Sequence, residues 1–348
     1  MPSAHRDEPR VVLAPDKLRG TLSAPQAADA LAAAARASGW AAEAVPLSDG
    51  GEGFLDVLAG MGGTVHTTRV TGPLGTPVTA AWRLEGDRAV IESALASGLE
   101  LAGGAEGNRP LDATSRGTGE LLVAALEAGA RRLLVGVGGS AMTDGGAAAV
   151  EVVEERGGLG GAELVVACDV QATFVDAAAL FGPQKGAGPD DVAELRRRLE
   201  RLAAAYAARY GLDVTTLPGA GAAGGLGGGL AVLGARLVPG FAVVAEAVGL
   251  EARLEDATLV LTAEGRLDAS SWTGKVVGGV VEAASGHGLR VVVLAGSVDE
   301  AGALEAARRG IEVIDLEARF GPERSRADAA GCLAETAADI LGPARSDD

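Results

Sequence analysis

The amino-acid sequence predicts an α/β protein of two domains, one built on a parallel sheet and the other on a mixed sheet. Short apolar runs alternate with helix-like segments at both ends of the chain, which is the pattern of strands joined by crossover helices. The middle of the chain differs, because Thr- and Val-rich segments there alternate in polarity. The length of 348 residues suits two domains that each bury a core.

The N-terminal segment carries the first strand–helix units. The apolar run at 10–16 stops at a Pro-Asp pair and predicts a strand. A helix is expected within 21–39, because Ser23 is a suitable N-cap, a proline follows in the first turn and Gly39 suits the C-terminal end. Residues 42–60 then predict a strand, a loop and a helix.

The middle of the chain predicts a different kind of sheet. Residues 64–101 alternate between polar and apolar side chains and contain turn signals, which favours antiparallel strands. The segments 131–140 and 163–169 are typical of buried strands. A helix is expected to begin at Pro189, with leucines on one face, so that its arginine run at 196–198 forms a solvated face.

Three further strand–helix units close the chain, with expected strands at 258–265, 290–297 and 311–317. Because both ends supply such units, one parallel-sheet domain of the Rossmann or flavodoxin-like type is expected to contain both. A mixed α/β domain is then inserted into it. The expected limits are 1–62 plus 251–348 for the parallel domain and 63–250 for the inserted domain. The final ARSDD is expected to be disordered.

The charge and composition exclude some classes of partner. The formal net charge is −17, which argues against nucleic acid or an anionic membrane as a partner. An anionic small molecule stays compatible with this charge, since a local cluster of basic groups can reverse the field in a cleft. The start, MPSAHRDEPR, lacks the apolar stretch of a secretory signal, so a cytoplasmic location is expected. The composition leaves the oligomeric state open.

The stretch LPGAGAAGGLGGGLAVLG at 217–234 contains eight glycines and no charge. A membrane span is disfavoured, because Gly and Ala are weakly hydrophobic and no basic loops or aromatic belts flank the stretch. GAGAAG matches G-x-G-x-x-G, but a poor strand and a proline precede it, which disfavours a nicotinamide-binding loop. Two interpretations stay open: a Gly/Ala helix packed tightly against a neighbour, or a nest of backbone N–H groups that binds an anion.

Several expected strands end in loops of small residues with a carboxylate or glycine. These loops are Asp16-Lys17, 48–53, 137–146, 168–170, 263–268 and 294–297. In open α/β sheets, ligands bind beyond the carboxyl ends of the strands, where loops and helix N-termini converge. The loops therefore predict a cleft that handles phosphate and metal.

Two of these loops carry groups suited to phosphoryl transfer. Asp49 and Glu52 either bind Mg²⁺ through oxygen or are acids favoured at a helix N-terminus. The segment AEGRLDASSWTGK holds Glu264, Arg266, Asp268 and Lys275 within twelve positions after a buried strand. Phosphoryl transfer uses a carboxylate to orient the attacking hydroxyl, a cation on the phosphates and an acid for Mg²⁺.

With these residues assembled, the chain resembles the bacterial glycerate kinase family of the D-glycerate 2-kinase type. The resemblance is carried by APDKLRGTLSA (14–24), SDGGEGFLD (48–56), IESALASGL (91–99), TSRGTGELL (114–122), GVGGSAMTDGG (136–146), VACDV (166–170), FGPQKGA (181–187), PGAGAAGGLG (218–227) and GRLDASSWTGKV (265–276). It implies a two-domain α/β kinase that uses ATP and Mg²⁺, phosphorylates a small hydroxy acid such as D-glycerate to 2-phosphoglycerate, and has the glycine stretch in its active-site wall.

Roles are assigned to residues in these blocks as hypotheses. Asp49 or Asp268 orients the acceptor hydroxyl, and Arg266 or Lys17 meets the substrate carboxylate. Lys275 faces phosphate. The residues expected to help hold Mg²⁺ are Glu52, Asp169 and Glu264. The residues expected to bind the cofactor are Gly219, Gly221, Gly224 and Gly225, together with Lys17.

The chain departs from the family pattern at 171–176, where QATFVD replaces an Asn-Pro-Leu stretch. This departure motivates two alternatives. One is a kinase of another small hydroxy acid or polyol. The other is a non-catalytic paralogue that binds a small acid or nucleotide.

Overall fold

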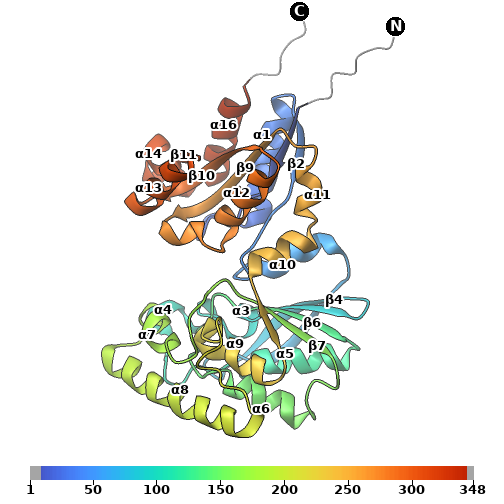
Figure 1. The fold of residues 1–348 in the computed structure, drawn as a ribbon, viewed down its shortest axis with the longest axis vertical. Helices are drawn as coiled ribbons and strands as arrows, with labels where there is room; N and C mark the ends of the chain where they lie inside the picture. Colours follow the sequence, from blue (N-terminus) through green and yellow to red (C-terminus); the bar gives the residue numbers. More distant parts are fainter. Residues whose placement is uncertain (1–8, 343–348) are drawn as a thin grey trace, which may run out of the picture. The chain divides into compact units, whose positions relative to one another are not determined.

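The computed structural model describes residues 9–342 (Figure 1). The first eight residues of the charged start and the ARSDD tail lie outside the described part. The chain forms two compact units: unit 1 runs to Asp49 and resumes at Val244, and unit 2 is Gly50–Val243. The second crossing falls inside helix α10 (Gly240–Ala247). The domain limits expected from the sequence, at 62/63 and 250/251, each lie several residues later in the chain than the two points where the chain passes from one unit to the other. These limits stay a prediction.

Unit 1 is built on a parallel sheet, as predicted. In the described part of the chain its strand order is β11-β10-β9-β1-β2, and every neighbouring pair is parallel. The strands are β1 (Arg10–Leu13), β2 (Ala41–Ala44), β9 (Leu259–Leu267), β10 (Arg290–Val298) and β11 (Glu312–Asp315). Strands from both ends of the chain thus share one sheet, because β1 lies between β2 and β9.

Helices cover the sheet of unit 1 on both faces. Val11 and Val12 are both fully buried although successive strand residues point to opposite faces. Helices α1 (Ala24–Ala37) and α16 (Ala329–Leu341) pack together and share one core with alternate strand residues. Helix α12 (Val276–Gly286) contacts β9 and β10. The remaining helices are α11 (Leu250–Leu254), α13 (Glu300–Arg309), α14 (Leu316–Phe320), α15 (Pro322–Ala327) and the 3-10 turn η4 (Ala269–Trp272).

The start of α1 confirms the prediction at Ser23. The Ser23 hydroxyl accepts a hydrogen bond from the backbone N–H of Gln26 at 3.3 Å, and the Gln26 side chain accepts one from the Ser23 N–H at 2.9 Å. This reciprocal pair satisfies two backbone donors at the helix end. Gly39 follows the helix with a φ of +78°.

Unit 2 carries the predicted mixed sheet, with the order β3-β4-β5-β6-β7-β8 among the described residues. The strands are β3 (Thr64–Thr71), β4 (Pro77–Glu85), β5 (Arg88–Glu92), β6 (Arg132–Gly136), β7 (Glu163–Ala167) and β8 (Arg236–Val238). The first three strands pair antiparallel, and β5 to β8 pair parallel. The strand expected at 131–140 therefore belongs to this sheet.

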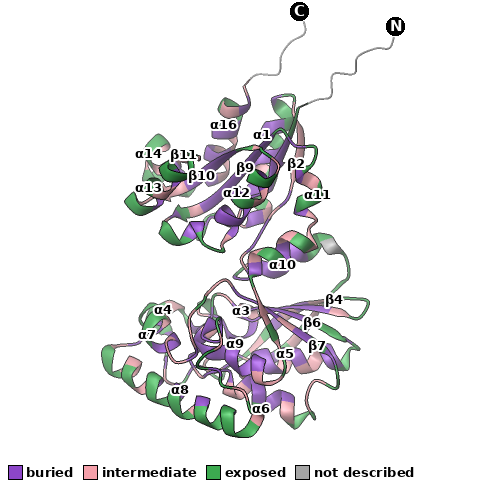
Figure 2. Ribbon diagram, viewed as in Figure 1, coloured by how far each residue is buried: buried purple, intermediate pink, exposed green. Residues whose placement is uncertain are grey.

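The helices of unit 2 range from single turns to a helix of 22 residues. They are α2 (Phe54–Val57), α3 (Ala94–Ser97), α4 (Gly104–Gly107), α5 (Arg116–Glu127), α6 (Ala147–Glu155), α7 (Ala177–Phe181), α8 (Pro189–Tyr210) and α9 (Ala222–Val232), with 3-10 turns at Leu58–Met61, Glu100–Ala102 and Pro183–Lys185. In α8, Leu195 and Leu199 are buried, and the arginines of 196–198 are exposed and paired with acids on the same helix (Figure 2). The solvated face predicted for that run is confirmed.

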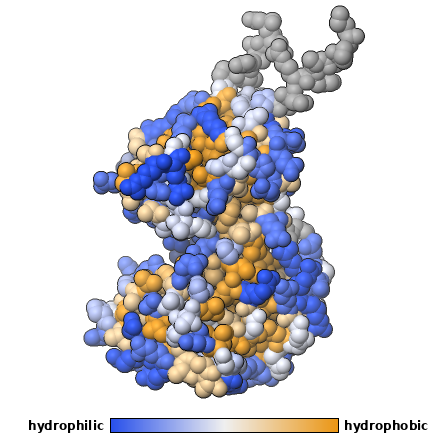
Figure 3. Space-filling view, viewed as in Figure 1, coloured by the Kyte–Doolittle hydropathy of each residue, from blue (hydrophilic) through white to orange (hydrophobic). Residues whose placement is uncertain are grey.

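The surface and the helix lengths bear on the membrane question. Hydrophilic side chains cover much of the surface of each unit in the view of Figure 3. Helix α9, which takes up most of the glycine stretch, has 11 residues and is interrupted by a kink at 223–225, where the backbone φ angles are positive. Between residues 9 and 342 no helix combines the length and the apolar character that a bilayer span requires.

Candidate functional site

The carboxyl ends of β1 and β9 bring together polar residues from the two ends of the chain. After β1, the backbone N–H of Asp16 donates to the carbonyl of Ala263 at 2.8 Å, so the loop at Asp16 and Lys17 runs beside β9. Glu264 lies in β9 itself. The next residue, Gly265, is in close contact with this loop, since a Cβ there would lie 2.8 Å from the Arg19 nitrogen.

Asp16 and Glu264 form an acidic pair in this site. Burial raises the pKa of Glu264 to about 8, with the nearby Asp16 and Asp268 carboxylates adding to the effect and the Ser271 hydroxyl and Lys275 opposing it. Burial also raises the pKa of Asp16 to about 6, with Lys17 opposing the effect and Asp49 adding to it. Glu264 is 8% exposed, and its Oε1 has no hydrogen-bond partner within residues 9–342. The pair can therefore hold a proton at neutral pH or accept a cation.

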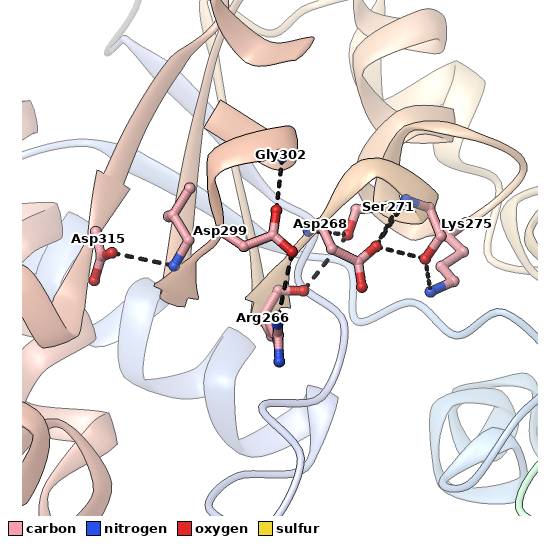
Figure 4. A network of polar contacts seen from close by, with 9 residues as sticks. Arg266, Asp268, Ser271, Lys275, Asp299, Gly302 and Asp315 are labelled. Carbon is pink, nitrogen blue, oxygen red and sulfur yellow. Dashed lines mark hydrogen bonds and ion pairs between the residues drawn. The ribbon is translucent and has the colours of Figure 1, made fainter. Parts of the chain in front are cut away.

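Asp268 is the ionised carboxylate of the site. Its Oδ1 caps η4 by accepting from the Ser270 N–H at 2.7 Å, the Ser271 N–H at 3.2 Å and the Ser270 hydroxyl (Figure 4). Burial alone would raise the pKa of Asp268, but these hydrogen bonds and the Lys275 charge lower it below its usual value. Among the described residues the hydrogen bonds engage Oδ1 alone, which leaves Oδ2 able to accept from a ligand.

Lys275 stands at the other end of the same turn. Its Nζ donates to the Ser270 hydroxyl at 2.7 Å. Lys275 is also the N-cap residue of α12. An ammonium at a helix N-terminus, where backbone N–H groups are also unpaired, is suited to phosphate. Its charge acts on Asp16, Glu264 and Asp268, so it lies among the three carboxylates.

Arg266 lies beside this cluster on β9. Its Nη2 is 3.4 Å from Oδ2 of Asp299, and its side chain is 68% exposed (Figure 4). Asp299 also accepts from the Gly302 N–H at 2.8 Å and so caps α13. The guanidinium has one weak partner among residues 9–342 and can take an anion from solvent.

In unit 2, the buried Glu92 carboxylate fixes the loop that carries Glu52 through hydrogen bonds to its backbone. Burial raises the pKa of Glu92, which accepts from the backbone N–H groups of Gly53 and Leu55 at 3.0 Å each. Gly50 has a φ of +86°, and a Cβ there would lie 2.6 Å from the Ala167 carbonyl oxygen, so this turn requires glycine. Glu52 is exposed in the turn. Sequence reasoning missed Glu92.

Asp169 follows β7, and its carboxylate lies at the N-terminus of α10. Its Oδ1 accepts from the Gly240 N–H at 2.7 Å, and its Oδ2 accepts from the Phe241 N–H at 3.3 Å. This is the helix N-terminal position that favours a carboxylate. The expected metal set is divided, with Glu52 and Asp169 in unit 2 and Glu264 in unit 1. Residues 9–342 contain no cluster of three or more His, Cys, Asp or Glu side chains placed to ligate a metal.

The glycines predicted to bind the cofactor pack against neighbouring loops. The N–H of Gly221 donates to Ala172 O at 3.0 Å, and that of Gly225 donates to Gly221 O at 3.2 Å. Gly224 has a φ of +67°, and a Cβ there would lie 2.1 Å from the Met142 carbonyl oxygen. A Cβ at Gly219 would lie 3.2 Å from Cys168 Sγ. These contacts favour the tight-packing interpretation for Gly221, Gly224 and Gly225, and phosphate binding by the four glycines stays a prediction.

Sequence reasoning gave no role to two polar residues of unit 2, the buried Lys185 and the half-buried Asp144. Lys185 is 3% exposed, and its Nζ donates to the Ser140 hydroxyl at 2.9 Å and to Met142 O at 2.6 Å. Asp144 accepts from the N–H and hydroxyl of Ser115 at 2.8 Å each. A sequence signal for Lys185 existed, because it is the single charge in the run 180–189.

Comparison with known proteins relates the chain to one family. A model described as "Glycerate kinase family" matches residues 11–157 and 147–343. The chain is 40% identical to the glycerate 2-kinase of Escherichia coli (strain K12) over 88% of this chain and 89% of the relative. It is 38% identical to the glycerate kinase of Halalkalibacterium halodurans over 83% and 86% of the two chains.

A solved structure agrees with these relatives. It comes from Salmonella typhimurium LT2, its protein carries the provisional name glycerate kinase 2, and it matches with a TM-score of 0.78 and 34% identity over 96% of this chain and 98% of that one. The family resemblance inferred from the sequence blocks is therefore confirmed. On the family match and the identity to these relatives, the chain belongs to the glycerate kinase family.

Proposed function

We propose that the protein transfers the γ-phosphoryl group of ATP to D-glycerate and forms 2-phosphoglycerate and ADP. Family membership supports glycerate kinase activity and the use of ATP. The observation that carries the proposal is the cluster of Asp16, Glu264, Asp268 and Lys275 at the carboxyl ends of β1 and β9. It combines an ionised carboxylate, a buried acid and a cation in the place where open α/β sheets bind ligands.

The position of the 2-hydroxyl as acceptor rests on the relatives, one of which is named glycerate 2-kinase. Asp268 is our first candidate to orient that hydroxyl, because it is ionised and its Oδ2 can accept. Asp49 is the second candidate, since its charge acts on Asp16 and it lies near the same pair. Arg266, largely exposed, is placed to pair with the substrate carboxylate, and Lys17 is the alternative.

A magnesium ion bound to nucleotide phosphates fits the residues of unit 1. The buried Oε1 of Glu264 without a partner is an oxygen ligand of the kind that Mg²⁺ takes, and Mg²⁺ usually needs one or two protein carboxylates besides phosphate and water. Glu264 would hold the ion, and Glu52 and Asp169 remain candidates from unit 2. When bound, MgATP supplies the phosphoryl group and neutralises charge on its oxygens. Lys275 would bind phosphate at the start of α12.

The substitution Asp268→Asn tests the role of the carboxylate. The Asn side chain keeps an oxygen for the η4 cap and removes the charge, so turnover should fall by about 10²- to 10⁴-fold with the fold intact. The matched control is Asp315→Asn, because Asp315 also caps a helix, at the Ala318 N–H, but lies at β11. Near-normal turnover of a folded Asp268→Asn protein would remove Asp268 from this role.

A panel of acceptors distinguishes the two alternatives that the 171–176 segment raised. In the structure this segment is fixed by Phe174, which is fully buried, and by the Ala172 carbonyl that accepts from Gly221. ADP release with D-glycerate well above that with other hydroxy acids and polyols supports the proposal. ADP release with a different acceptor would identify that acceptor as the substrate. Thermal stabilisation by ATP without any ADP release would indicate a binding protein.

A further inference from the structure

Unit 2 contains a cavity of about 450 Å³ that none of the proposed roles uses. Helix α8 forms one wall with Leu195, Leu199 and Leu202. Pro110, Leu111 and Ala113 form another. The inner end is formed by Thr143, Asp144 and Ala147. All of these residues belong to one compact unit, so the cavity does not depend on how the two units are arranged.

Two polar groups at the inner end are suited to a ligand that carries a hydroxyl. Thr143 is 1% exposed, and its Oγ1 has no hydrogen-bond partner in the part of the chain that the structure describes. A buried hydroxyl without a partner is costly, so a ligand that satisfies it gains free energy. Asp144 lines the same end and is half-buried, with its carboxylate fixed by Ser115 and Gly146. A carboxylate there favours a donor such as O–H and repels an anion.

The solvent-exposed end of the cavity, at the arginines of α8, has the reverse charge. Arg198 and Arg201 line it from α8 with exposed guanidinium groups. Both contact one acid, Glu194, which Arg197 also contacts. Three guanidinium groups around one carboxylate leave an excess of positive charge at this end, in a chain whose net charge is −17.

We infer that this cavity binds a small organic acid that has an apolar body and a hydroxyl at the end opposite its carboxylate. The hydroxyl donates to Asp144 and pairs with Thr143, the apolar body contacts the α8 leucines, and the carboxylate meets Arg198 and Arg201. This arrangement matches each end of the cavity to the opposite polarity and leaves no buried charge unpaired.

A bound acid would also stabilise the loop that forms the inner end. The Gly145 N–H donates to Gly224 O at 3.0 Å, and the neighbouring Met142 carbonyl accepts from Lys185. A ligand on Thr143 and Asp144 therefore adds a contact to a loop that is packed against α9. Binding should raise the midpoint of thermal unfolding, since a ligand that binds only the folded state stabilises it.

The probe for this site is 3-(4-hydroxyphenyl)propanoate, measured by calorimetric titration and by thermal unfolding of the full chain without ATP or glycerate. Two analogues separate the ends of the cavity. 3-Phenylpropanoate lacks the hydroxyl and should bind about tenfold more weakly, because Thr143 stays unpaired. 4-Ethylphenol lacks the carboxylate and should bind about threefold more weakly, since exposed charge pairs contribute little.

Substitutions on α8 supply matched pairs. Ala205 lines the cavity and is exposed, so Ala205→Trp should fill the opening and abolish binding, whereas Ala204→Trp on the same exposed helix should not change it. Arg201→Ala should weaken binding, whereas Arg196→Ala should not, because Arg196 pairs with Glu200 away from the lining residues. Ala205→Trp should leave basal ADP release from D-glycerate unchanged.

The inference is overturned if the probe fails to bind at millimolar concentration, or if Ala205→Trp binds it as the wild type does. It is also overturned if ATP or glycerate displaces the probe, since the cavity would then be part of the active site. These readouts need no turnover, so failure of the proposed kinase activity would not be mistaken for failure here.

Discussion

Replacing Lys185 by methionine is expected to remove a pH dependence of stability that belongs to unit 2. Burial lowers the pKa of Lys185 to about 7, with the Asp144 carboxylate opposing the effect. The usual pKa of lysine, 10.5, applies in the unfolded chain. Between these two values the unfolded state binds more protons than the folded state. Raising the pH through this window therefore stabilises the folded wild type.

The size of the change in the free energy of unfolding follows from the pH range between the folded and unfolded pKa values of Lys185. One proton that is bound only in the unfolded state changes the free energy of unfolding by about 1.4 kcal/mol per pH unit. Between pH 7 and pH 9 the wild type should therefore gain about 2–3 kcal/mol relative to Lys185→Met. Below the pKa of Lys185 in the folded state, the free energies of unfolding of the two proteins should change with pH in parallel, because Lys185 is then protonated in both the folded and the unfolded state. Methionine fills a similar volume and carries no proton, so other titrating groups cancel in the difference.

Urea unfolding followed by tryptophan fluorescence measures this difference in unit 2. Trp82 is buried in β4 of that unit, so a background of Trp40→Phe and Trp272→Phe leaves a reporter there. The control is Arg131→Met, which removes an exposed charge from the same unit and should retain the wild-type slope, because an arginine stays protonated throughout this pH range. Parallel curves for the wild type and Lys185→Met from pH 6 to pH 9 would refute the assignment of a lowered pKa to Lys185.

Two further substitutions test the loops around the site. Gly224→Ala should destabilise unit 2 by about 3 kcal/mol or more in urea unfolding, since its Cβ would meet Met142 O at 2.1 Å, whereas Gly234→Ala, with a φ of +96° and open space around it, should cost only about 1–2 kcal/mol. Equal losses at the two glycines would show that close packing is not the cause. Glu92→Ala should cost about 2–4 kcal/mol by leaving the N–H groups of Gly53 and Leu55 unpaired, and Glu92→Gln, which keeps an acceptor, should cost less. A Glu92→Ala protein as stable as Glu92→Gln would contradict this role.

The elements that the sequence predicted correctly depend on local patterns. The helix start at Ser23, the strands at both ends of the chain and the solvated arginines of α8 follow from neighbours within a few positions. The approach of residues that follow the strands could also be expected, because the carboxyl ends of parallel strands meet at one edge, whereas their roles stay predictions. Lys17, Asp49, Glu264, Asp268 and Lys275 do come together there.

The remaining features depend on contacts between distant segments. The Lys185 ammonium is held by the Ser140 hydroxyl and the Met142 carbonyl. The Glu92 carboxylate accepts from the backbone of the 53–55 turn. No local sequence pattern predicts that these distant segments meet. The glycines of α9 show the same limit. The spacing of the glycines at 219–225 was compatible with an anion nest, and only the positions of Met142 and Ala172 favour close packing; phosphate binding by these glycines stays a prediction.

We propose that this chain phosphorylates D-glycerate at its 2-hydroxyl with ATP. The most direct measurement is phosphorus NMR of the product formed by the purified protein from MgATP and D-glycerate, with ADP release followed in the same sample. We expect ADP and 2-phosphoglycerate in equal amounts, and formation of both slower by about 10²- to 10⁴-fold in Asp268→Asn. A product phosphorylated at another hydroxyl, or no product from a folded protein that binds ATP, would contradict it.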